Sequence, residues 1–236
     1  MAADIDIRVS PSLDAELFKG LDGYTDENAH FVADAVSAFN DAYVTIARIH
    51  DATEAGKRNQ AWTEENRILI VGKEAMKHRD RLLRKMDFAA RTLATNIAHT
   101  EEQLSKPLEA RALGTLNAEI RACVKAMDGK ERAKLLQEAM AGDDDTTLSS
   151  ILAAPPFLSG MTSVDRDHYL HLYHSKKSPH LVERLTLLRG AAAKVDRDGR
   201  RVFVEIEKAV GAPANQVRGI EAANEAALKA LRIEPA

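Results

Sequence analysis

Apolar residues recur every three or four positions between Thr63 and Leu104, and this spacing constrains the fold more than any other feature. A 3.5-residue period held for about five heptads is typical of a coiled-coil helix or a long helix in a bundle. We predict that this helix packs or oligomerises along a single stripe. The stripe is formed by Leu69, Met76, Leu83, Met86, Leu93, Ile97 and Leu104.

A second stretch with the same period begins after Ser178 and Pro179, which are favoured as an N-cap and a first helical residue. Gly211 and Pro213 end it. The sequence thus predicts a second long helix over 179–210, packed antiparallel to its neighbours. Its predicted stripe is formed by Leu181, Leu185, Leu188, Val195, Val202 and Ile206.

The composition agrees with these periods. Aromatic residues make up 5% of the 236 residues, and the chain has only 12 glycines and 7 prolines. So few aromatics and turn-forming residues argue against a β-sandwich or barrel. The single cysteine, Cys123, excludes intramolecular disulfides and zinc sites built on several cysteines. The predicted fold class is all-α, a bundle of long antiparallel helices with coiled-coil-like seams.

Two prolines and a glycine interrupt the helical pattern at 154–160. We expect an ordered elbow here that sets the angle between two helical portions, 25–153 and 161–236. Residues 1–24 are predicted to form an N-terminal arm and a short helix. The elbow residues are Pro155, Pro156, Phe157 and Gly160.

Two of the other helices predicted before the elbow flank the long helix. Thr25 is a suitable N-cap for a helix over 25–54. Pro107 is expected to end the long helix and to begin the next one, over 107–127, because proline fits the first turn of a helix but not its interior. Cys123 lies on the apolar stripe of that helix, so we predict a buried thiol.

A run of basic residues lies on the long helix, at Lys73, Lys77, Arg81, Arg84 and Lys85. Clustered cations are what phosphate binding needs, so nucleic-acid contact is one interpretation. Acidic residues intervene, however, at Glu74, Asp80 and Asp87, and no aromatic residue alternates with the cations for base stacking. A solvated helix face is therefore the favoured interpretation.

The remaining polar clusters carry no recognisable catalytic motif. His168, His171, His174 and His180 could bind a metal or respond to pH, but their spacing does not match a zinc motif and favours plain surface or packing histidines. The acidic residues 143–145 lack the ligand pattern of a calcium loop and read as a helix-capping loop. We therefore predict no enzymatic activity, no cofactor and no metal.

One segment has a familiar order of elements. Residues 142–188 read GDDDTTLSSILAAPPFLSGMTSVDRDHYLHLYHSKKSPHLVERLTLL. A short helix precedes an Ala-Pro-Pro-aromatic-Leu-Ser-Gly turn, and a Tyr- and His-bearing helix and a long charged helix follow. This order resembles a recurring segment of uncharacterised helical proteins encoded in bacteriophage and prophage genomes. The resemblance covers a fifth of the chain, transfers no catalytic residue and implies a phage context.

These observations together predict a non-enzymatic structural or assembly protein, a bacteriophage virion component that forms oligomeric helical contacts with itself or with other virion or assembly proteins. A transient assembly scaffold and a nucleic-acid-associated or regulatory coiled-coil protein are the alternatives. The sequence lacks an apolar run of about 20 residues and a basic, apolar leader, so we expect neither membrane insertion nor secretion. The expected location is the virion or the host cytoplasm.

Overall fold

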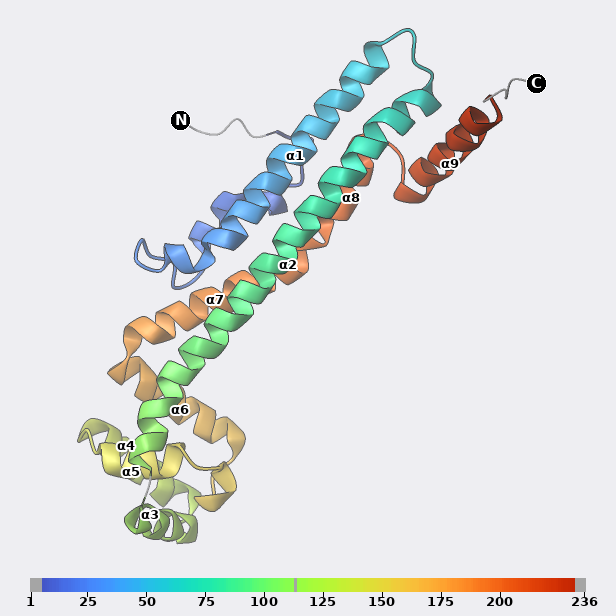
Figure 1. Cartoon of the computed structure of the whole chain (residues 1–236). Helices are drawn as coiled ribbons and strands as arrows, with labels where there is room; N and C mark the ends of the chain where they lie inside the picture. The colour runs from blue at the N-terminus through green and yellow to red at the C-terminus, as the bar shows by residue number, and fades with distance from the viewer. Residues whose placement is uncertain (1–5, 113, 232–236) are drawn as a thin grey trace. The chain divides into compact units, whose positions relative to one another are not determined.

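The computed structural model describes residues 6–112 and 114–231, which form helices joined by short turns and contain no strand (Figure 1). The predicted all-α class is confirmed. Residues 1–5 of the predicted arm and residue 113 of the predicted helix 107–127 lie outside this description. None of the helices in the described part of the chain is both long and apolar enough to cross a membrane.

The chain forms two compact units. The first contains the described residues of Met1–Ala94 and Arg189–Ala236, and the second is Thr95–Leu188. The division falls within two helices rather than at the Pro-Pro segment, which lies inside the second unit. The portions 25–153 and 161–236 that we expected therefore do not coincide with the compact units.

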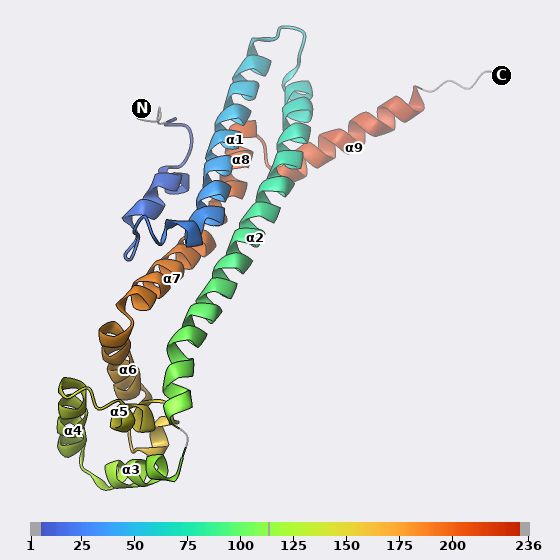
Figure 2. The same cartoon turned by 60° about the vertical axis from the view of Figure 1, so that its left-hand side comes forward.

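The first unit is built on a helical hairpin of α1 (Ala33–Arg58) and the part of α2 (Glu64–Arg111) up to Ala94. The two helices run antiparallel, and α1 also packs against α8 (Figures 1 and 2). The other elements of this unit are three 3-10 helices, the end of α7 and two C-terminal helices: Pro11–Leu13, Ala15–Gly20, Ala29–Val32, α7 (Pro179–Gly199), α8 (Arg201–Val210) and α9 (Ala214–Ala230).

Aromatic packing and a buried ion pair hold the N-terminal segment to this hairpin. Phe18 meets Phe39 of α1 edge to face, with 5.1 Å between the ring centroids, and both side chains are fully buried. Lys194 of α7 is only 4% exposed. Its ammonium donates hydrogen bonds to the Ser12 carbonyl at 2.9 Å and to Asp198 Oδ2 at 3.1 Å, so one charge joins α7 to the N-terminal segment.

The second unit packs short helices around the end of α2. Its elements after α2 are α3 (Thr115–Ala126), α4 (Gly129–Ala141), α5 (Asp145–Leu152), the 3-10 helix Pro156–Leu158, α6 (Ser163–Lys177) and α7 up to Leu188. Its core includes Leu108, Val124, Leu136, Leu148, Ile151, Leu152 and Tyr173. Asp128 and Glu131 form a capping box that starts α4, and the Thr162 hydroxyl caps α6.

The long helix does not break at Pro107, as the sequence led us to expect, but continues to Arg111. Proline removes one helical hydrogen bond, here the one that would reach the Gln103 carbonyl. Both Pro107 and Gln103 are exposed, so water can take the place of the missing donor. Leu104 and Leu108 are buried on the opposite side and stabilise the helix through this point.

The first predicted stripe is buried over part of its length. Met86, Leu93 and Leu104 are buried, but Leu69, Met76, Leu83 and Ile97 are only half-buried. Between 68 and 89 the structure also buries residues one position before predicted ones, at Ile68, Ala75, Leu82 and Ala89. Burial along this part of α2 is therefore not confined to the predicted stripe.

Residues 179–210 form two helices instead of one, since a turn at Arg200 separates α7 from α8. In the second predicted stripe, Leu188, Val195, Val202 and Ile206 are buried, whereas Leu181 and Leu185 are half-buried. The helix predicted over 25–54 begins later and ends later, at Ala33 and Arg58. A 3-10 helix replaces its first turns.

In the second unit, the structure corrects the prediction for Cys123 and adds detail to the Pro-Pro segment. Cys123 is exposed, so the thiol is not part of the core, whereas its neighbour Val124 is buried. In the Pro-Pro segment, Pro156 begins a 3-10 helix, Phe157 is 66% exposed, and Gly160 adopts a positive φ of 67°. The Arg132 guanidinium donates hydrogen bonds to the carbonyls of Met127 and Gly160, which fixes this segment against α4.

Candidate functional site

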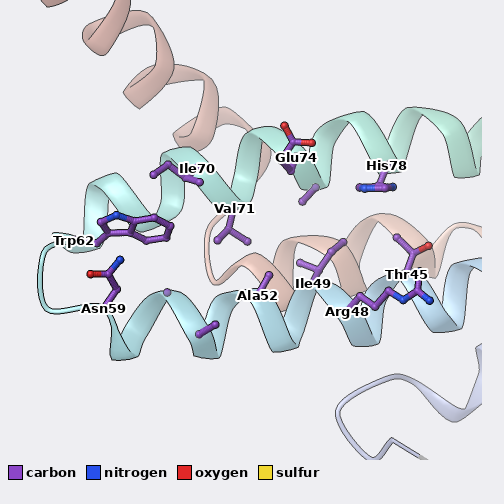
Figure 3. A pocket seen from close by; sticks show the side chains of 13 residues that line it. Thr45, Arg48, Ile49, Ala52, Asn59, Trp62, Ile70, Val71, Glu74 and His78 are labelled. Carbon is purple, nitrogen blue, oxygen red and sulfur yellow. The ribbon is translucent and has the colours of Figure 1, made fainter.

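An apolar groove lies between α1 and α2, next to the turn that joins them (Figure 3). It encloses about 500 Å³ and is open to solvent. Most of its lining is apolar and comes from both helices and the turn. The apolar side chains that line it include Ile49, Ala52, Ala55, Trp62, Ile70 and Val71.

Small residues on α1 create the groove. Ala52, Ala55 and Gly56 follow one another along the side of α1 that lines it, so few side-chain atoms fill the space between the helices. Gly56 is also required for close packing. A Cβ at this position would lie 2.9 Å from Arg67 Cγ, which is tighter than a normal contact, and 3.4 Å from the Trp62 ring.

Arg67, at the start of α2, holds α8 in place beside the groove helices. Its side chain is buried, and its guanidinium donates a hydrogen bond to the Val210 carbonyl at 3.2 Å. This bond satisfies a carbonyl at the C-terminal end of α8, where the helix itself provides no donor. Gly211 follows with a φ of 80° and ends α8, as the sequence predicted. Arg67 thereby fixes α8 to the start of α2.

The turn between the two helices places Trp62 at one end of the groove. Asn59 Oδ1 accepts a hydrogen bond from the Ala61 amide, and the Asn59 carbonyl accepts one from the Trp62 amide. The Thr63 hydroxyl then caps α2 by accepting from the Asn66 amide at 3.2 Å. These local bonds fix the backbone that carries the indole, and Figure 3 shows the indole at the turn end of the groove.

The opposite end of the groove is polar. Thr45 and Arg48 from α1 and Glu74 and His78 from α2 line it, and Figure 3 shows His78 on the side of α2 that is turned toward α1. Glu74 accepts a hydrogen bond from Lys77 at 2.6 Å, and this contact lowers the pKa of the Glu74 carboxyl, so the group is anionic at neutral pH. A cation and an anion therefore stand beside a large apolar surface, an arrangement that suits recognition of an amphipathic partner.

The predicted basic run lies outside the apolar lining and is largely neutralised. Three of its five members have a carboxylate partner: Lys73 with Glu221, Lys77 with Glu74, and Lys85 with Asp41. Arg81 and Arg84 are exposed beside Phe88, which is itself 60% exposed. The five residues thus do not form one continuous cationic surface.

The histidines follow α6 and the start of α7 without converging. His168, His171 and His180 are exposed, and His174 is half-buried. Burial, and then the nearby His171, lowers the pKa of His174. Within the part of the chain that the structure describes, no group of three or more histidine, cysteine or carboxylate side chains is placed to hold a metal ion.

The acidic loop caps a helix, as predicted, because Asp144 accepts a hydrogen bond from the Thr147 amide at 3.0 Å. Its other two carboxylates bind the basic end of α6. Asp143 pairs with Lys176 and Lys177 at 2.9 and 3.0 Å, and Asp145 pairs with Lys177 at 3.0 Å. The loop therefore helps to close the second unit.

No protein-family model, curated protein or solved structure matches this chain. The resemblance of residues 142–188 to phage proteins stays a prediction.

None of the groove residues named above was predicted as a site from the sequence. The signal that could have found them is the set of small residues on α1, together with Ala75 on the buried stripe of α2. Small residues on both of two facing helices indicate either close packing or unfilled space. Only the tertiary structure decides between these outcomes.

Proposed function

We propose that this chain is a non-enzymatic structural or assembly protein that forms oligomeric contacts through its helices, and that the α1–α2 groove is one of its contact surfaces. The observation that carries the proposal is the open apolar groove of about 500 Å³. Contiguous exposed apolar surface is costly in water and typically marks an interaction site. Ile70, which lines the groove, is 40% exposed.

The groove has the chemistry of a helix-binding surface. It runs between two antiparallel helices, its centre is apolar, and Arg48 and Glu74 provide charges of both signs at one end. An amphipathic helix would bury its apolar face along the centre and place its charged residues at that end. A polar small molecule would leave most of the apolar lining uncompensated.

A phage particle is the proposed setting, and the resemblance of residues 142–188 supports it. Within that setting, a retained virion component and a scaffold that leaves the particle are distinguished by mass spectrometry of finished particles. The component would be present in them and the scaffold absent.

The nucleic-acid alternative has less support, because carboxylates neutralise Lys73, Lys77 and Lys85. We expect no salt-dependent binding of duplex DNA at low ionic strength. Binding that weakens steeply as salt is added would favour this alternative over ours.

Light scattering over a range of protein concentrations tests the proposed function. We expect the wild-type chain to be oligomeric and Ile70→Glu to dissociate it, because a charge in the groove would be desolvated on association. The matched control is Val164→Glu, at a position that is 76% exposed on α6 in the other unit. A wild-type chain that stays monomeric at all concentrations would contradict the proposal.

A further inference from the structure

The second half of α9 is exposed in the described part of the chain. Val217, near its start, is 1% exposed, but every residue from 222 to 231 is exposed. Leu228 is 56% and Leu231 is 72% exposed, although both are large apolar side chains. An isolated helix shorter than about 12–15 residues is marginal in water, so this half needs a partner to stay helical.

The exposed leucines continue a buried stripe. Val217 packs on Gly72 of α2, and the half-buried Ile220 and the exposed Leu228 and Leu231 follow it at helical spacing. A partner surface that receives them must be apolar. Alanines occupy half of residues 222–231, so that partner can approach the α9 backbone closely.

We propose that the exposed half of α9 docks in the α1–α2 groove of a second copy of this chain. The inference rests on the function proposed above and names the occupant of the groove. The lengths agree, because residues 222–231 span about 15 Å, and the groove from Thr45 to Asn59 spans about 20 Å at 1.5 Å per residue. Exchange of α9 in both directions closes a twofold dimer.

The α9 helix cannot reach the groove of its own chain. A Cβ at Gly72 would lie 2.8 Å from the Val217 methyl carbons, so the first turns of α9 pack tightly on α2. Glu221 then pairs with Lys73 at 2.7 Å. From this anchor α9 lies on the side of α2 that faces away from α1, as Figures 1 and 2 both show.

The two surfaces complement each other in charge as well as in shape. With Leu231 at the Trp62 end, Glu225 points toward the polar end, where Arg48 is exposed. The apolar centre of the groove receives the leucines in this orientation.

Disulfide trapping between two single-cysteine chains tests the docking directly. Both carry Cys123→Ser, one carries Ala55→Cys in the groove, and the other carries Leu228→Cys. Because each chain has one cysteine, a disulfide between the two different chains can form only across an interface. We expect this disulfide to form at least tenfold faster than when Val204→Cys, at a position 63% exposed on α8, replaces the groove cysteine. Equal rates would overturn the proposal.

The dimerisation constant tests the contribution of the α9 side chains. Leu228→Glu and Leu231→Glu should each weaken dimerisation at least tenfold, without affecting the fold, because both positions are exposed in one copy. Leu116→Glu, at a position 59% exposed on α3, is the control and should leave the dimerisation constant unchanged. Arg48→Glu and Glu225→Arg should each weaken the dimer, and the two together should restore it.

The outcomes separate this inference from the proposed function. If Ile70→Glu dissociates the wild-type oligomer but Leu228→Glu and Leu231→Glu do not, the groove is a contact surface and α9 is not its occupant. If the wild-type chain is monomeric throughout, the proposed function itself fails. The inference holds if Ile70→Glu, Leu228→Glu and Leu231→Glu all dissociate the oligomer. The disulfide must also form faster with Ala55→Cys than with Val204→Cys.

Discussion

We expect Lys194→Met to lower the free energy of unfolding of the first unit by about 3 kcal/mol. The Lys194 side chain is buried, and its ammonium donates to the Ser12 carbonyl and to Asp198. It also lies 5.1 Å from the centroid of the Phe39 ring. Methionine is a flexible apolar side chain of similar length, so the substitution removes the charge and its hydrogen bonds while keeping most of the packing.

The magnitude follows from what is left without a partner. Removing one member of a buried ion pair costs about 3–5 kcal/mol, because the remaining charge stays desolvated. Asp198 keeps part of its compensation, since Arg197 still donates to both of its carboxylate oxygens at 3.0 and 2.9 Å. The hydrogen bond to the Ser12 carbonyl and the cation–π contact with the Phe39 ring are lost completely. The balance places the cost at the lower end of the range.

Urea titration followed by tryptophan fluorescence measures this cost. Trp62 is the only tryptophan and lies in the first unit, so its signal reports the unfolding of that unit. The control is Arg200→Met, which breaks the 2.8 Å ion pair between Arg200 and Asp196. Their side chains are 80% and 74% exposed, respectively. Exposed pairs contribute little, so the control should hardly change the midpoint. If Lys194→Met is no more destabilising than the control, the reasoning from burial is refuted.

Three further predictions concern stability. Gly72→Val should force Val217 off α2 and lower the free energy of unfolding by about 1–3 kcal/mol. Amide hydrogen exchange in α9 should become faster, and unchanged exchange would contradict the close contact between Gly72 and Val217. Hydrogen bonds from arginine and lysine hold the pKa of Asp198 below its usual value. The free energy of unfolding should therefore fall as pH drops through that lowered pKa, and Asp198→Asn should remove this slope. Arg132→Met should destabilise the second unit by about 2 kcal/mol, measured by circular dichroism, because the carbonyls of Met127 and Gly160 lose this donor.

The features that the sequence predicted well depend on neighbouring residues. The end of α8 at Gly211 and the capping of a helix by the acidic loop follow from backbone and capping preferences, which act within one turn. The all-α class follows from helical periods held over many residues. Such signals do not depend on which helices meet, so the sequence alone is sufficient for them.

The features that it missed depend on the environment that tertiary contacts create. Lys194 and Asp198 are spaced four residues apart, as are Asp196 and Arg200, yet the first pair is buried and the second is exposed. Nothing in the spacing distinguishes them. Cys123 was predicted to be buried because it shares an apolar stripe, but the second unit covers its neighbour Val124 instead.

The groove and the exposed half of α9 have a common physical origin. Where Ala52, Ala55 and Gly56 line α1, few side-chain atoms are available to contact α2, so dispersion contacts are missing and apolar surface stays in water. A chain with only 5% aromatic residues has few large side chains to fill such a space from within. Leu228 and Leu231 are large side chains that this same unit leaves exposed. A second copy therefore brings to the groove the atoms that it lacks, and the groove buries the leucines that α9 cannot bury alone.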